Sequence, residues 1–175
     1  MNSPYQQYWR TPRLDKGKDG AVYAISDTLV AKIPLKDDGI GDLEKELGIM
    51  ANLFSHNVNV PEPVGILPID VRHWGNVYGI FGSSRQGLVM QRLYGVMCSA
   101  IAGELEFAQA HKMYNEEYKK AEALGYDMVD HDTDSDGLFN GIYDTKLKKV
   151  FLIDFFRWNL PDGVILRNRK AFIKE

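Results

Sequence analysis

The sequence contains one cysteine, Cys98, and no apolar run long enough to cross a membrane. A single cysteine cannot form a disulfide within the chain, and this favours a reducing compartment. A membrane-spanning helix needs about 20 consecutive apolar residues. The N-terminal stretch MNSPYQQYWRTPR also lacks the apolar core of a signal peptide. We therefore expect a soluble protein that is cytoplasmic where it acts, and delivery into a host cell stays an open alternative.

Basic residues are scattered along the chain instead of gathering into a stripe. Lys and Arg number 21 against 24 Asp and Glu, which gives a net charge of −3. Nucleic-acid binding usually needs a strongly basic face, so this class is set aside. The 45% of apolar and 26% of charged residues are ordinary for a globular protein. A chain of 175 residues suits one domain, or two small lobes that share a hinge.

The first half of the chain reads mostly as strands. Segments rich in β-branched and aromatic residues predict strands within 11–35 and a hairpin that joins 76–81 to 87–93. Apolar residues at helical spacing predict a helix over 37–54. The proline-punctuated stretch 57–65 predicts a loop.

The second half begins with a long predicted helix over 97–124, with the charges of EEYKK on its outer side. Two short strands, 140–144 and 149–156, are expected around a polar turn. We therefore predict one α+β domain over the whole chain, with a β-rich N-lobe over about 1–93 and a reduced helical C-lobe over about 94–175. The inner face of the long helix is predicted to carry Ile101, Leu105, Ala108, Tyr114, Tyr118, Ala121 and Leu124.

The first predicted hairpin has features of a phosphate-binding loop. The stretch DKGKDGAVY places Gly17 and Gly20 three residues apart, with Val22 close behind. Glycines allow backbone N–H groups to approach phosphate oxygens closely. An ordinary glycine turn is the alternative, because this spacing alone is not specific.

Lys32, in the stretch VAKI, stands where an apolar residue is expected if it shares a face with Val30. A lysine that points inward needs an anion. Glu46 lies four residues before Met50, on the inner face of the predicted helix that follows, and could supply that anion. Glu44 is the alternative partner.

The stretch VDHDTDSDGLFNGIYD, residues 129–144, contains five aspartates. The run from Asp132 to Gly137 could begin a calcium loop of the D-x-D-x-D-G kind. Such a loop needs a bidentate glutamate at its twelfth position, where this chain has Tyr143. A solvated acidic turn is a second alternative.

In chain order, the motifs GKDGAVY, VAKI, EKELGIMANL, MVDHD and LIDFF resemble the signature of the protein-kinase-like fold. That signature is a Gly-rich loop, a V-A-I-K lysine, a helix glutamate, an H-R-D-x-x-x-x-N catalytic loop and D-F-G. The segment LVMQRLYG resembles the strand and hinge that bind adenine through backbone groups. The resemblance covers about residues 10–160 and is greatest to minimal kinases, such as some bacterial pathogen effectors.

The resemblance implies a phosphotransferase that uses ATP and Mg²⁺. Lys32 would hold the α and β phosphates, and Glu46 would orient Lys32. Asp132 would position the acceptor hydroxyl, whereas Asn140 and Asp154 would bind the metal. The residues that contact the nucleotide would be Gly17, Gly20, Val22, Lys32, Gln91 and Leu93.

The sequence also departs from the kinase signature. Asp130 replaces the histidine of H-R-D, and Asp132–Asn140 is three residues longer than the family spacing, so Asp134 stays an alternative catalytic residue. Phe156 replaces the glycine of D-F-G, which should limit flipping of that segment. Only residues 155–175 follow the predicted metal ligand, which leaves almost no activation segment.

A protein serine or threonine is the expected acceptor. Related antibiotic-phosphorylating enzymes usually build their small-molecule pocket from additional C-terminal helices, for which this sequence shows no counterpart. The alternatives are a small-molecule kinase, a catalytically inactive kinase-like binding module and a calcium-binding interaction domain. We expect a monomer with a protein substrate, which could be a host protein, and no nucleic-acid or membrane partner.

Overall fold

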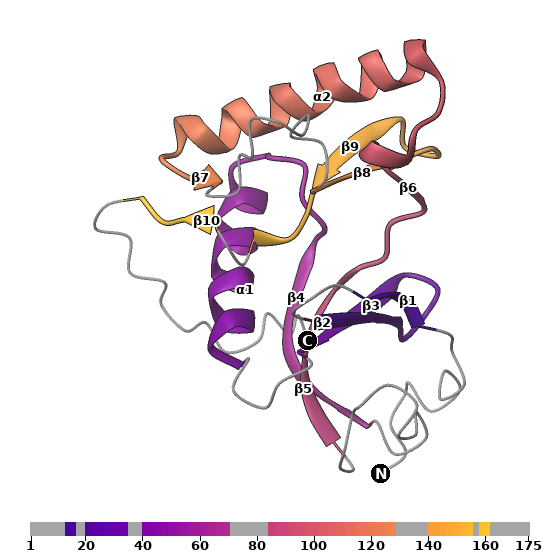
Figure 1. Ribbon diagram of the computed structural model, residues 1–175. Coiled ribbons are helices and arrows are strands. Elements are labelled where there is room, and N and C mark those ends of the chain that lie inside the picture. The colour runs from indigo at the N-terminus through magenta and orange to yellow at the C-terminus, as the bar shows by residue number, and fades with distance from the viewer. Residues whose placement is uncertain are drawn as a thin grey trace. The chain divides into compact units, whose positions relative to one another are not determined.

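The chain has an α+β fold (Figure 1). The computed structural model describes residues 13–16, 20–34, 40–70, 84–128, 140–155 and 158–161. The chain divides into two compact units. The first unit comprises Met1–Leu47, Pro63–Arg92 and Asn168–Glu175, and the second comprises Gly48–Glu62 and Leu93–Arg167.

A five-stranded antiparallel sheet forms the centre of the first unit, in the order β1-β2-β3-β5-β4. Its strands are β1 (Arg13–Lys16), β2 (Gly20–Ala24), β3 (Leu29–Pro34), β4 (Pro63–Asp70) and β5 (Ser84–Gln91). The strands predicted within 11–35 are thus confirmed. The β-branched and aromatic residues of these segments suit the pleated, half-buried surface of a sheet.

Side chains from four of these strands form a hydrophobic cluster on one face of the sheet. Successive side chains of a strand point to opposite faces, so the alternate residues of β3, including Lys32, point away from this cluster. This alternation decides which face of the sheet carries polar chemistry. The cluster comprises Ala21, Tyr23, Ile25, Ala31, Ile33, Ile69 and Val89.

Strand β4 corrects the prediction of a loop over 57–65, because the chain is extended and paired with β5 from Pro63 onward. Proline has no N–H to donate, and an edge strand tolerates it. β4 stands at the end of the sheet order, which accommodates Pro63 and Pro68. The predicted strand 76–81 lies outside the described residues, and β5 pairs with β3 and β4.

Helix α1 (Ile40–Ser55) confirms the helix predicted over 37–54. Its buried side includes Leu43, Met50 and Leu53, at the expected helical spacing. The helix ends where Asn57 adopts a left-handed conformation with φ 59°. The N–H groups of the residues after the helix then bond the carbonyls of its last turn, as in a helix C-cap.

The second unit contains a three-stranded antiparallel sheet in the order β6-β8-β9. These strands are β6 (Gly95–Met97), β8 (Gly141–Asp144) and β9 (Lys149–Leu152). Helix α2 (Glu104–Ala123) packs against β9 (Figure 1). A further two-stranded pair joins β7 (Asp127–Met128) to β10 (Trp158–Asn159).

Helix α2 begins later than predicted. A short 3-10 helix, Cys98–Ala100, is followed by extended backbone, and the α-helix starts after Gly103. The predicted inward position of Leu105 is wrong, because its side chain is 85% exposed, and Ala108 is exposed as well. The six steps from Ala108 to Tyr114 turn a helix by about 600°, which leaves the two side chains about 120° apart, so the two groups of predicted residues cannot share one face. The buried residues of α2 are Ala110, Tyr114, Glu117, Tyr118 and Ala121.

Neither described helix is both long and apolar enough to span a membrane.

Candidate functional site

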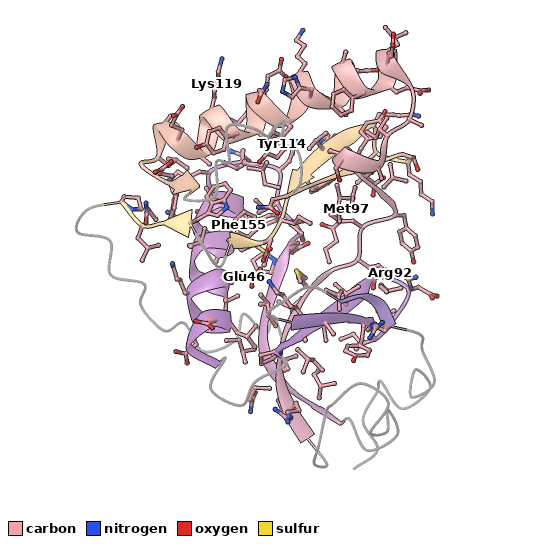
Figure 2. All side chains as sticks on the ribbon, in the orientation of Figure 1. Glu46, Arg92, Met97, Tyr114, Lys119 and Phe155 are labelled. Carbon is pink, nitrogen blue, oxygen red and sulfur yellow. The ribbon has the colours of Figure 1, made fainter. Side chains whose placement is uncertain are left out.

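Lys32 and Glu46 form an ion pair within the first unit. The Lys32 Nζ atom lies 2.9 Å from Glu46 Oε1 and 2.8 Å from Glu46 Oε2. The lysine side chain is 15% exposed and that of Glu46, labelled in Figure 2, is 4% exposed. The predicted pairing is therefore present, whereas the alternative partner Glu44 is exposed.

The sheet register places Lys32 between apolar neighbours. Val22 of β2 lies opposite Lys32 on one side, and Leu88 of β5 lies opposite it on the other. Leu88 is fully buried and Val22 is half-buried. An ammonium group among such neighbours requires a close anion, because burial of an unpaired charge is costly. Helix α1 supplies that anion from its inner face.

Gly20 of β2 lies beside the stem of the Lys32 side chain. A Cβ atom at this position would lie 3.5 Å from both Cγ and Cε of Lys32, and 3.1 Å from the Ile33 carbonyl oxygen. The approach to the lysine stem would be an ordinary van der Waals contact, whereas the approach to the Ile33 carbonyl oxygen would be tighter than usual. Gly20 therefore permits the close approach of β2 to β3 beside Lys32. The other predicted glycine of this loop, Gly17, lies outside the described residues.

Gln91 and Leu93, the predicted adenine-binding residues, flank the point where the chain passes from the first unit to the second. Gln91 is the last residue of β5 and lies opposite Leu29 of β3. The following residue, Arg92, donates its backbone N–H to the Thr28 carbonyl oxygen at 2.7 Å. The backbone at the end of β5 is therefore held by the turn between β2 and β3.

In the second unit, the β8–β9 hairpin brings the backbones of Asn140 and Asp154 to the same end of the sheet. Asn140 immediately precedes β8, and Asp154 follows β9 by two residues. The Ile153 N–H donates to the Asn140 carbonyl oxygen at 2.8 Å. Asp154 is exposed and adopts a left-handed conformation with φ 61°, which aspartate tolerates better than most residues. A carboxylate and an amide oxygen are ligands that suit Mg²⁺.

The predicted catalytic residues Asp132 and Asp134 lie outside the described residues, as does the run from Asp132 to Gly137 considered as a calcium loop. Their roles stay predictions. Within the described part of the chain, no group of three or more His, Cys, Asp and Glu side chains is placed to hold a metal ion.

Asp144, which sequence reasoning did not single out, is a buried carboxylate that organises the β8–β9 turn. Its Oδ1 atom accepts the backbone N–H groups of Lys146 at 2.9 Å and Leu147 at 2.8 Å, and its Oδ2 atom accepts that of Tyr94 at 3.1 Å. Burial on its own would raise the pKa of this carboxyl, but the three N–H donors and the Lys146 charge lower the pKa overall. An aspartate that begins a polar turn between two strands was the available sequence signal.

Beneath β8, the absence of a side chain at Gly141 permits close packing. A Cβ atom there would lie 2.8 Å from Cδ2 of Tyr114 and 3.1 Å from Sγ of Cys98. Burial raises the pKa of the Cys98 thiol to about 11 and raises the pKa of the Tyr114 hydroxyl. Both groups are thus neutral packing elements at physiological pH. They support the strand that follows Asn140.

No protein-family model matches the sequence, and comparison with curated proteins finds no match. Function is therefore inferred from the residues and their geometry. The chain combines a fixed, paired lysine in the first unit with a carboxylate and an amide at one end of a hairpin in the second. The lysine can neutralise an anion, and the carboxylate and the amide can contribute oxygen ligands to a hard cation.

Proposed function

We propose that the chain is an ATP- and Mg²⁺-dependent phosphotransferase of the protein-kinase-like kind, with a two-lobed arrangement and a protein serine or threonine as acceptor. The Lys32–Glu46 ion pair is the observation that carries this proposal. In protein kinases, a lysine on the third strand must pair with a glutamate on the following helix before phosphoryl transfer can occur. Here the lysine lies on β3 and the glutamate on the helix that follows β3.

The proposal gives each residue a separate task in binding. Lys32 neutralises phosphate oxygens of the nucleotide, and Glu46 keeps the ammonium group in place. Gly20 and Val22 lie on β2, the strand that pairs with the Lys32 strand on one side. A fixed cation suits this task because phosphoryl transfer depends mainly on positioning and on charge neutralisation.

The metal would be held by Asn140 and Asp154, whose oxygen atoms suit Mg²⁺. A metal ion held there would supply positive charge to offset the charge on the phosphates of the nucleotide. Asp132 accepts the hydrogen bond and the proton of the acceptor hydroxyl, with Asp134 as the alternative. Gln91 and Leu93 offer backbone groups to the adenine ring.

Incubation with labelled ATP, Mg²⁺ and a mixture of candidate proteins tests the proposal. The wild-type chain should transfer label to protein, and Lys32→Met should abolish transfer and weaken nucleotide binding. Lys119→Met is a matched control, because Lys119 is an exposed lysine on α2 (Figure 2). Equal transfer by the wild-type chain and Lys32→Met would refute the assignment of Lys32.

A catalytically inactive kinase-like binding module is the second candidate function. Asp130 in place of the signature histidine, and Phe156 in place of the signature glycine, favour this alternative. In the same experiment, nucleotide binding without transfer to protein or to small acceptors would select the binding module. A folded chain that binds no nucleotide at millimolar concentration would contradict both functions.

A further inference from the structure

Glu117 on helix α2 is a buried carboxylate, 6% exposed, that bonds a distant backbone group. Its Oε2 atom accepts the N–H of Asn59 at 2.8 Å, and its Oε1 atom accepts Lys120 Nζ at 2.6 Å. The Lys120 side chain is 50% exposed, so this ion pair contributes little to stability. The burial of this carboxylate is therefore better explained by its hydrogen bond from the backbone N–H of Asn59, because a carboxylate is a strong acceptor.

Asn59 in turn holds the end of strand β9. Its carbonyl oxygen accepts the N–H of Leu152 at 2.9 Å, and the next N–H along the strand, that of Ile153, donates to the Asn140 carbonyl oxygen at 2.8 Å. Two consecutive amides are thus fixed immediately before Asp154. One is fixed by the segment that Glu117 holds, and the other by the residue that precedes β8.

Phe155, which directly follows Asp154, is held by aromatic packing. Phe155, labelled in Figure 2, is 1% exposed and meets Trp158 edge to face, with ring centroids 5.1 Å apart. Trp158 also packs against Tyr118 of α2, with centroids 6.1 Å apart. Adjacent residues of α2, Glu117 and Tyr118, therefore lead by separate routes to the two sides of Asp154.

Asp154 needs such support because of its backbone conformation. A left-handed conformation in a residue other than glycine costs about 1 kcal/mol or more, and it persists only where the surroundings determine it. The φ of Asp154 is 61°. The contacts on both sides of Asp154, at Leu152 and Ile153 before it and at Phe155 after it, contribute to holding this conformation.

We propose that Glu117 is a positioning residue for metal binding, which acts through Asn59 and Leu152 to hold Asp154 in place. This inference rests on the proposed function, in which Asp154 binds the metal. It gives α2, which contributes no ligand of its own, a role in metal affinity. Because the route consists of hydrogen bonds to backbone, it depends more on the reach of the Glu117 side chain than on its charge.

Two substitutions separate reach from charge. Glu117→Asp keeps the charge near Lys120 but is one methylene too short to bond Asn59 as before. Glu117→Gln loses the charge but keeps an oxygen at the same reach. Lys120→Met is the control for the ion pair. The affinity of the full chain for Mn²⁺ is measured by electron paramagnetic resonance at saturating ADP, and amide hydrogen exchange of Leu152 and Ile153 is measured by NMR.

Glu117→Asp should weaken Mn²⁺ binding by more than about twofold but by less than the roughly tenfold loss typical of a group bonded directly to a metal ligand, and should speed exchange at Leu152. Glu117→Gln and Lys120→Met should both stay within about twofold of the wild type. ADP affinity without metal should be the same in all four proteins. This pattern is not the one expected of a charge that merely stabilises the helix.

Unchanged Mn²⁺ affinity in Glu117→Asp would overturn the inference, as would a larger loss in Glu117→Gln than in Glu117→Asp. Unchanged exchange at Leu152 in Glu117→Asp would overturn the hydrogen-bond route itself. Failure of the proposed function has a different result, in which the wild-type chain and Asp154→Asn bind Mn²⁺ equally weakly with ADP present. That result leaves no metal site for Glu117 to position and removes the inference with it.

Discussion

A carboxylate as buried as that of Glu46, whose side chain is 4% exposed, is unfavourable unless a cation accompanies it. Lys32 supplies this cation, with both carboxylate oxygens within 2.9 Å of its Nζ atom. A pair of apolar side chains could fill the same space at no loss of stability, since burial of an ion pair offsets most of its attraction. The pair is therefore better explained by the positioning of a charge than by stabilisation of the fold.

Removal of one partner should destabilise the protein more than removal of both. Lys32→Met leaves the Glu46 carboxylate buried without its cation and should lower the free energy of unfolding by about 3 kcal/mol. The double substitution Lys32→Met with Glu46→Leu should recover at least half of that loss. Urea denaturation of the wild type, both single variants and the double variant measures the coupling. Additive losses would show that the two side chains do not depend on each other.

Substitutions of Asp132 and Asp154 are expected to affect different steps, phosphoryl transfer in one case and metal binding in the other. Asp132→Asn should remove most phosphoryl transfer while nucleotide affinity stays nearly intact, because this residue acts in the transition state. Asp154→Asn should weaken Mg²⁺-ATP binding and transfer together. Asparagine tolerates a left-handed backbone, so the free energy of unfolding of Asp154→Asn should lie within about 0.5 kcal/mol of the wild-type value. Loss of transfer in Asp134→Asn but not in Asp132→Asn would move the catalytic position by two residues.

At the scale of single elements, the turn between β8 and β9 depends on the charge of Asp144. Its pKa is lowered in the folded protein, because the N–H groups of Leu147, Tyr94 and Lys146 favour the carboxylate over the acid. A lowered folded-state pKa gives stability that is present above the unfolded-state pKa and is lost as the pH falls through the folded-state pKa. This contribution is therefore complete near neutral pH and decreases below about pH 4.

Asp144→Asn should remove this pH dependence. The variant should be less stable than the wild type at pH 7, because the amide is a weaker acceptor for three N–H donors. The difference in the free energy of unfolding, about 1–3 kcal/mol, should shrink as the pH is lowered from 5 to 3. Chemical denaturation at several pH values measures it. A difference that is constant between pH 7 and pH 3 would show that the Asp144 charge is not responsible.

Elements with strong local periodicity were predictable from the sequence. Helix α1, strands β2 and β3 and the Lys32–Glu46 pair follow from alternation in a strand and from the spacing of apolar residues in a helix. The same hairpin pattern that predicts β8 and β9 brings Asn140 and Asp154 to one end of the sheet. Each of these features depends on residues that are close in sequence, or on the next element along the chain.

Features that depend on distant partners were not predictable. β4 is a strand despite two prolines, because β5 pairs with it along one edge. Glu117 belongs to the charged stretch EEYKK, which the sequence places on the outer side of a helix, yet it is buried. Its partner, Asn59, is 58 residues away, and nothing in the local pattern indicates that contact. The contacts on both sides of Asp154 likewise come from residues distant in sequence: Leu152 bonds Asn59, and Phe155 packs against Trp158, which packs against Tyr118.

At the scale of the whole molecule, Cys98 reports on opening of the second unit. Its side chain is fully buried, and burial raises the pKa of its thiol to about 11. The thiolate is the reactive form, and the raised pKa keeps the Cys98 thiol almost entirely protonated at pH 8. Reaction with a thiol reagent should therefore require that the protein open. The rate of reaction then measures the population of the open state.

Mg²⁺-ADP should slow the labelling of Cys98 if nucleotide binds the folded chain. A ligand present at 100 times its Kd stabilises the folded state by about 2.7 kcal/mol, which reduces the open population about 100-fold. Labelling at pH 8 with and without Mg²⁺-ADP, at reagent concentrations where opening and closing are fast, measures this factor.

Asp154→Asn is the matched control, because it should keep the slow labelling of the free protein but lose most of the additional protection from Mg²⁺. Protection by Mg²⁺-ADP that is equal in the wild type and in Asp154→Asn would show that Asp154 is not a metal ligand. Two explanations would be left if Mg²⁺-ADP gave no protection in a folded wild-type chain. Either nucleotide does not bind, or Cys98 is exposed by a local opening that binding does not affect. A melting temperature that rises with nucleotide would select the second explanation, and an unchanged one would select the first.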